Sequence, residues 1–223
     1  MRPISNMKIT FDLETWGSAT KPTRSDIEVP KNYKKEEAIN RYIDDNIDAA
    51  WGKQGLNSLK GEIACIGVAK DDEPVEVLYT KTTEEDLMKR FDAWLIDKGV
   101  EELTQIYWIG HNLSGFDIPW IAHRAWKYNL DGLSMMLPVK AYDEHIIDTM
   151  LIFMSTSRDP KSKVKLDVLS KYLGYEGKAG MDGSMVHQAF IDGKHKEIAE
   201  YCENDVMITR DIVKRLRPWM WRQ

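Results

Sequence analysis

Four short apolar runs are the feature that most limits what this chain can fold into. They span residues 8–13, 62–70, 75–79 and 105–110, and each has the length of a strand and is too short for a buried helix. Segments with helical spacing of apolar residues lie between and after these runs, at residues 36–51, 82–99, 114–128, 145–155, 165–173 and 195–217. This order predicts an α/β fold, in which helices pack against a mixed β-sheet.

Local signals mark several helix ends. Thr82 and Glu85 have the spacing of a capping box, and Gly99 ends the helical pattern that follows them. Pro119 is tolerated in the third helix because it falls in the first turn. Gly174 closes the fifth helix, where a residue without a side chain is favoured.

The composition is that of a globular domain. The chain has 223 residues, of which 43% are hydrophobic and 30% charged, and these values exclude a mainly disordered chain. Residues 17–60 are more polar than the rest and too few to form a core of their own. We therefore expect a single domain over residues 1–223 with an insertion at residues 17–60.

The charge does not mark a binder of duplex DNA. The net charge is -5, so the whole chain lacks the basic surface typical of such proteins. Residues 158–171 nevertheless carry five basic and two acidic side chains. This segment either meets phosphate groups or forms a solvated loop and helix face, and the sequence leaves both open.

The apolar runs and the cysteines of the sequence predict a cytoplasmic protein without a membrane span. The N-terminus lacks the apolar core of a secretory signal, and no run reaches the roughly 18 apolar residues of a membrane helix. The two cysteines, Cys65 and Cys202, are not closely spaced, which suits a reducing compartment. The histidines show no ligand spacing either, so the pattern argues against a zinc enzyme.

Acidic side chains occupy positions that secondary structure would bring together. Asp12 and Glu14 end the first strand and, being two apart, point to the same face. Asp117 begins a helix just after a strand, and Asp205 lies one helical turn after Tyr201. Each acid alone also fits a solvated strand end or a favourable helix-terminus charge. Together they suit two Mg²⁺ or Mn²⁺ ions, roughly 4 Å apart, that act on a phosphodiester.

Three motifs made by these residues resemble those of the DEDD 3'-5' exonucleases. They are D-L-E-T at 12–15, N-x-x-x-F-D at 112–117 and Y-x-x-x-D at 201–205. The tyrosine is typical of the subclass represented by the proofreading domain of family B DNA polymerases, whereas the other subclass has a histidine where this chain has Glu200. The longer pattern is similar to the predicted 3'-5' exonucleases related to that domain.

The resemblance implies a ribonuclease H-like fold and a set of functional residues. Asp12, Glu14, Asp117 and Asp205 would bind two divalent cations, with Asp12 bridging them, and Tyr201 would orient the attacking water.

The resemblance also implies residues that contact the substrate. Asn112 and Phe116 would shape the strand-binding cleft, and Leu13 and Thr15 would hold the 3' end, unless they are simply a core leucine and a strand threonine. Two further residues have alternatives as well: Asp148 would support the metal site or cap its own helix, and Lys178 would reach a phosphate or lie on the surface.

The function that follows is removal of nucleotides from the 3' end of single-stranded or frayed DNA, in replication, repair or proofreading. Single-stranded nucleic acid is the expected partner, with DNA favoured over RNA, and a replication protein could act with the chain in trans. Two alternatives stay open: an exoribonuclease, and a catalytically silent module that binds nucleic acid or a polymerase.

Overall fold

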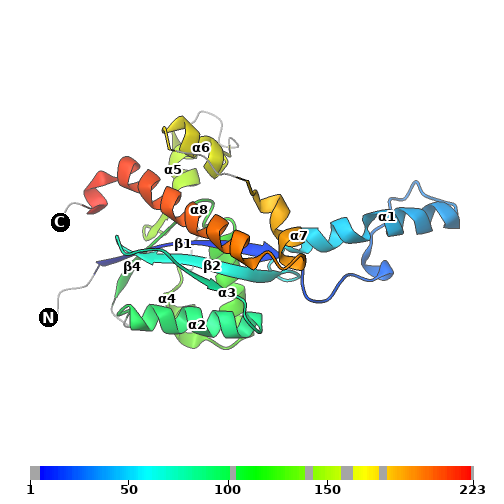
Figure 1. The fold of residues 1–223 in the computed structure, drawn as a ribbon, viewed down its shortest axis with the longest axis horizontal. Helices are drawn as coiled ribbons and strands as arrows, with labels where there is room; N and C mark the ends of the chain where they lie inside the picture. The colour runs from blue at the N-terminus through cyan, green and yellow to red at the C-terminus, as the bar shows by residue number, and fades with distance from the viewer. Residues whose placement is uncertain (1–5, 101–103, 139–142, 157–162, 176–179, 222–223) are drawn as a thin grey trace.

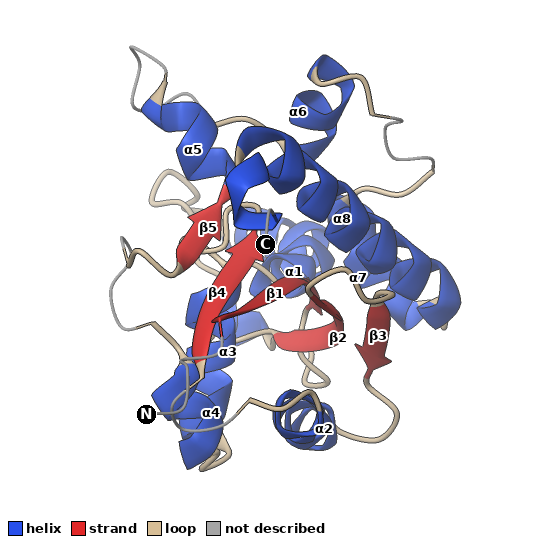
Figure 2. Cartoon of the chain, turned by 90° about the vertical axis from the view of Figure 1, so that its left-hand side faces the viewer, coloured by secondary structure: helices blue, strands red, loops and turns tan. Residues whose placement is uncertain are grey.

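A mixed β-sheet forms the centre of the fold. The computed structural model describes residues 6–100, 104–138, 143–156, 163–175 and 180–221. Within these residues the strand order is β3-β2-β1-β4-β5 (Figures 1 and 2). The strands are β1 (Asn6–Trp16), β2 (Glu62–Lys70), β3 (Glu76–Tyr79), β4 (Gln105–Gly110) and β5 (Ile146–Asp148). The first three pair antiparallel, whereas β4 is parallel to both β1 and β5. The predicted α/β fold with a mixed sheet is confirmed.

Helices cover both faces of the sheet. They are α1 (Glu36–Gln54), α2 (Glu84–Asp97), α3 (Asp117–Lys127), α4 (Asp131–Met136), α5 (Thr149–Ser155), α6 (Leu166–Tyr172), α7 (Val186–Ile191) and α8 (His195–Leu216). α8 lies across one face, and α2, α3 and α4 lie on the other (Figure 1). Among the described residues, none of the helices is both long enough and apolar enough to cross a membrane.

Strand β1 separates an apolar face from a polar one. The main core includes its residues Met7, Ile9, Phe11 and Leu13. There Phe11 meets Trp108 of β4 edge-on at 5.6 Å and Phe91 of α2 at 6.2 Å between ring centroids. Alternate residues of a strand point to opposite faces, so Asp12 and Glu14 lie on the side covered by α8. The core therefore fixes which way the acids point.

The structure corrects two local predictions. Residues 146–148 form strand β5 and not the start of a helix, because Ile146 pairs with Trp108 in the sheet and the helix begins only after Asp148. The cap of α2 is Thr83 and not Thr82, since the Thr83 side chain accepts a hydrogen bond from the Asp86 N–H at 3.1 Å. The closing glycine after α6 is confirmed, with a positive φ of 81° at Gly174.

Residues 17–60 leave the body of the fold at the end of β1 and return at β2. Helix α1 projects away from the sheet (Figure 1). Its last turns pack back through Trp51, whose ring lies 6.4 Å from that of Trp16 and whose indole N–H donates to the Ser18 carbonyl at 2.8 Å. The base of the segment is thus attached to the end of the strand that carries Asp12 and Glu14.

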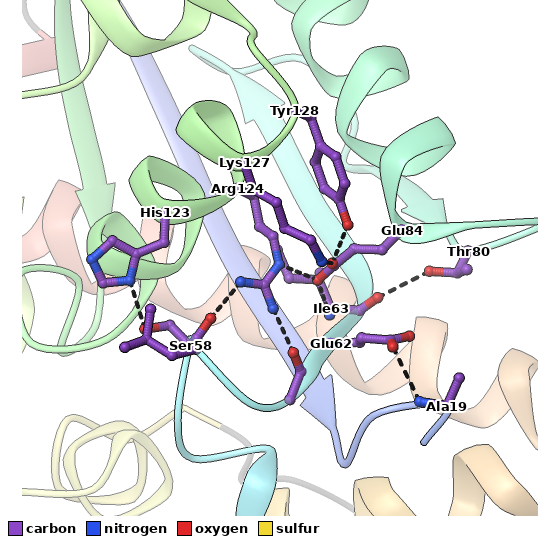
Figure 3. A network of polar contacts seen from close by, with 12 residues as sticks. Ala19, Ser58, Glu62, Ile63, Thr80, Glu84, His123, Arg124, Lys127 and Tyr128 are labelled. Atoms are coloured by element: carbon purple, nitrogen blue, oxygen red, sulfur yellow. Dashed lines mark hydrogen bonds and ion pairs between the residues drawn. The ribbon is translucent and has the colours of Figure 1, made fainter.

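A buried ion pair fastens the return of this segment to α2 and α3 (Figure 3). Arg124 of α3 and Glu84 of α2 form an ion pair at 2.5 Å, with side chains only 4% and 3% exposed. Arg124 also donates to the carbonyls of Ser58 and Gly61, and Glu84 accepts from the Ile63 N–H at 2.8 Å. These bonds satisfy backbone groups just before and at the start of β2, so the pair fastens this part of the chain to α2 and α3.

Candidate active site

The acids of β1 lie together under α8. Ligand atoms of Asp12, Glu14 and Cys202 all lie within 4.8 Å of one another. The β1–β2 register shifts between Glu14, which pairs with Cys65, and Thr15, which pairs with Ile63. Such a bulge twists the strand and re-aims its side chains. The predicted juxtaposition of two carboxylates on one strand face is what the structure contains.

Asp117 approaches this pair from helix α3, which lies on the face of the sheet opposite α8 (Figure 1). Strand β4 ends at Gly110, and its pairing with β1 stops at Thr10, so β1 continues beyond its parallel partner. The Asp117 carboxylate, in the first turn of α3, accepts the Leu13 N–H at 3.1 Å. Burial, and then the nearby Asp12 charge, raise the pKa of Asp117 well above its ordinary value. A cation would relieve this cost.

Helix α8 supplies the remaining predicted residues. Asp205 is 4% exposed and Tyr201 is half-buried one turn before it. Burial raises the pKa of Tyr201 above its ordinary value, and the charges of Asp205, Glu14 and Asp12 raise it further. The phenol therefore keeps its proton, and it lies in the field of three of the four predicted acids.

A cavity of about 900 Å³ opens beside these acids. Its walls include Asp12, Tyr201 and Asp205, and on the α6 side Lys163, Lys165 and Lys171. The volume is within the usual range for ligand sites in proteins. Acidic and basic groups thus face the same space.

The residues predicted to contact substrate differ in their placement. Asn112 lines the cavity. Phe116 packs against Trp120, with 5.8 Å between ring centroids. Leu13 is buried in the main core, and the Thr15 hydroxyl donates to the Gly55 carbonyl at 2.5 Å. Phe116, Leu13 and Thr15 are not among the residues that line the cavity.

Asp148 organises the loop that carries the second motif. Its carboxylate accepts the N–H groups of Asn112 at 3.0 Å and Ser114 at 3.2 Å. It also caps α5 by accepting the Met150 N–H at 3.0 Å. The sequence left a supporting and a capping role open, and the side chain makes both kinds of contact. Lys178 lies outside the described residues.

Sequence reasoning missed three polar neighbours of the site. Asp182 lines the cavity and accepts the Ser184 N–H at 2.8 Å, in a D-G-S segment whose only signal is that of a turn. The Cys202 thiol accepts from the Gly67 N–H at 3.1 Å and contacts the Asp12 carbonyl at 3.5 Å. His111 lines the cavity too. No spacing rule distinguishes these residues, because their contacts come from distant parts of the chain.

The structure thus combines a mixed sheet, flanked by helices on both faces, with acidic side chains gathered beside its central strand. Residues 62–216 match the model of a family described as predicted 3'-5' exonucleases related to the exonuclease domain of PolB. The chain belongs to this family. The matched range includes Asp117, Tyr201 and Asp205, whereas Asp12 and Glu14 precede it.

The solved structures that are similar to the chain include a DNA polymerase and an exonuclease, and no curated protein sequence matches it. The family B DNA polymerase of the hyperthermophilic archaeon Pyrobaculum calidifontis matches over 96% of this chain and 25% of the polymerase, with 14% identity and a TM-score of 0.55. E. coli Exonuclease I, in complex with an oligonucleotide, matches over 97% of this chain and 42% of its own, with 13% identity and a TM-score of 0.47. The chain spans a quarter of the polymerase's length. The polymerase likeness confirms the predicted ribonuclease H-like fold.

Proposed function

We propose that the chain is a metal-dependent 3'-5' exonuclease that removes nucleotides from the 3' end of single-stranded or frayed DNA. The observation that carries the proposal is the convergence of acids from β1, α3 and α8: Asp12 and Asp205 line the cavity, Glu14 lies beside Asp12, and Asp117 is bonded to the backbone of the same strand at Leu13. Carboxylates held this close repel one another unless protons or cations compensate them. The family supports the direction of cleavage, and the polymerase likeness favours DNA over RNA.

The donor set suits two divalent cations of the Mg²⁺ or Mn²⁺ kind. Asp12, Glu14, Asp117 and Asp205 would hold them, with Asp12 between the two. Oxygen donors are the ligands that these ions prefer. The pKa of Asp117 is raised by burial and by the Asp12 charge, and a bound cation would offset both effects. Such ions, when bound, stabilise the charge that develops on the phosphoryl group during in-line displacement.

Tyr201 would orient the attacking water. Its raised pKa keeps the phenol protonated at neutral pH, so the hydroxyl can donate or accept a hydrogen bond but cannot act as a base. Asp148 would keep the 112–114 loop in place, because it binds two backbone N–H groups there. Asn112 would then present its side chain to the nucleotide in the cavity.

We also propose that residues 17–60 are an insertion within a single exonuclease domain. Two observations support this. The family match begins at residue 62, immediately after the segment and at the first residue of β2. In addition, the Arg124–Glu84 pair fastens the return of the segment to helices of the domain.

Digestion of end-labelled oligonucleotides tests the proposed function. DNA and RNA carrying a 5' label are incubated with Mg²⁺, Mn²⁺ or EDTA. We expect stepwise shortening of DNA that EDTA abolishes, and Asp12→Ala and Asp205→Ala each to remove nearly all turnover. Faster shortening of RNA would favour an exoribonuclease. Binding without any shortening would favour a silent module, and activity that survives EDTA would contradict a metal mechanism.

A further inference from the structure

His111 ties the loop before α6 to the end of strand β4. One ring nitrogen, Nδ1, hydrogen-bonds with the Thr149 hydroxyl at 2.8 Å, and the other, Nε2, lies 2.8 Å from the Val164 carbonyl oxygen. A carbonyl oxygen can only accept, so Nε2 carries a proton and donates it. The imidazole therefore fixes the backbone at Val164 relative to the loop that carries Asn112.

This contact holds the short segment that carries two lysines, Lys163 and Lys165. Residues 163–165 are not helical, and Lys165 is extended, with φ −73° and ψ 149°. Lys163 and Lys165 flank Val164 in this segment. Both are exposed and line the cavity, while Val164 between them packs against the cluster that contains Leu166 and Ile208. Val164 thus anchors the segment in this apolar cluster, and both lysines remain exposed at the cavity.

The charges across the cavity are complementary to a polyanion. Asp12 and Asp205, from β1 and α8, and the two lysines, from the segment before α6, line the same cavity. A third lysine that lines the cavity, Lys171, is paired with Asp167 at 2.8 Å and is therefore already neutralised. A chain of phosphates could place one group at the cation-loaded acids and preceding groups at Lys163 and Lys165.

We propose that Lys163 and Lys165, held in place by His111, form a phosphate-binding subsite for the nucleotides that precede the cleaved bond. The ligand is the phosphodiester backbone of a single strand. This subsite rests on the proposed nuclease function, since it takes the cavity as the place of the 3' end. In this arrangement the lysines bind substrate and His111 is a positioning residue.

Salt dependence of binding tests the two lysines. A fluorescein-labelled single-stranded DNA with phosphorothioate linkages at its 3' end is titrated in Ca²⁺ at several NaCl concentrations. Each lost phosphate contact lowers the slope of log K against log salt by about 0.7 for a single strand. Lys163→Gln/Lys165→Gln should therefore lower the slope by about 1.4, which corresponds to about 25-fold weaker binding at 0.1 M salt and about fivefold at 0.3 M. Lys89→Gln, an exposed lysine on α2, is the matched control and should keep the wild-type slope.

Substrate size separates this subsite from the nuclease function itself. Thymidine 5'-(p-nitrophenyl phosphate) has a scissile ester but no preceding phosphates. We expect the ratio of kcat/KM on the oligonucleotide to kcat/KM on this ester to fall at least tenfold in the double lysine variant and in His111→Ala. If His111 only stabilised the fold, His111→Ala would lower kcat/KM on both substrates by the same factor and leave their ratio unchanged. If wild-type protein hydrolyses neither substrate, the proposed function fails, and the salt slope alone decides the subsite. An unchanged slope and ratio in the lysine variant would overturn the subsite.

Discussion

The Asp117 carboxylate accepts a hydrogen bond from the Leu13 backbone N–H, across 104 residues of sequence. This contact places the helix acid beside the strand that carries Asp12 and Glu14. Any oxygen acceptor of the same shape could make the bond, whereas only a carboxylate brings a negative charge. The geometric and the electrostatic roles of Asp117 can therefore be separated by mutation.

Replacing Asp117 with asparagine should stabilise the metal-free protein and abolish nuclease activity. The amide keeps an acceptor for the Leu13 N–H and removes a carboxylate whose pKa is raised by burial and then by the nearby Asp12 charge. In a domain of this size each kcal/mol of relieved repulsion raises the melting temperature by about 2–4 °C. Thermal unfolding in EDTA measures this gain. Added Mn²⁺ should stabilise the wild-type protein and have little effect on the variant.

Asp117→Ala is the matched comparison. It removes the same charge, but it also leaves the buried Leu13 N–H without its acceptor, which costs about 1–3 kcal/mol. The alanine variant should therefore melt below the asparagine variant. Equal melting temperatures for the two would show that the hydrogen bond to Leu13 contributes nothing.

Tyr201→Phe should lower kcat and leave cation binding unchanged. The hydroxyl is proposed to orient the water and not to hold a metal, and a misplaced reactant costs about 10²-fold in rate. Because the Tyr201 pKa is raised, the alkaline limb of the pH–rate profile should be the same in both proteins. Single-turnover rates measure the expected loss of kcat, and Mn²⁺ titration by calorimetry measures cation binding. Weaker Mn²⁺ binding in the variant would place the phenol among the ligands.

The sequence predicted those parts of the site that follow from local periodicity. Strand alternation was enough to put Asp12 and Glu14 on one face, and the one-turn spacing of Tyr201 and Asp205 was enough to put both on one side of α8. Strand β5 was missed because three residues are too few for a periodic signal. The sequence left open whether the basic segment near Lys163 meets phosphate, because its orientation depends on the distant imidazole of His111.

Arg124→Met should destabilise the fold strongly. Removing the arginine leaves the Glu84 carboxylate, 3% exposed, without its buried partner and leaves the carbonyls of Ser58 and Gly61 without a donor (Figure 3). Breaking a buried ion pair in this way costs about 3–5 kcal/mol. Urea unfolding measures the loss as a shift of the midpoint at constant slope.

Lys127→Met is the control for this prediction. Lys127 contacts the same Glu84 carboxylate at 3.4 Å, but its side chain is 54% exposed. Exposed ion pairs contribute about 0–1 kcal/mol. Similar midpoints for the two variants would show that burial of the Arg124 pair does not hold the start of β2.

Stability should decrease in mild acid because of His187. Its Nδ1 accepts the Gly17 N–H at 3.1 Å, which requires that nitrogen to be unprotonated, and its ring stacks with that of Trp16 at 6.4 Å between centroids. Burial lowers the pKa of His187, although the Asp48 charge opposes this. A lowered folded pKa means that the unfolded chain binds the proton more tightly. The contribution of His187 to stability is therefore fully present above the unfolded pKa of about 6.5 and is lost as pH falls through the folded pKa. Urea unfolding between pH 5 and 8 should show a smaller decrease in His187→Gln than in wild type, and parallel curves would mean that the histidine does not titrate with folding.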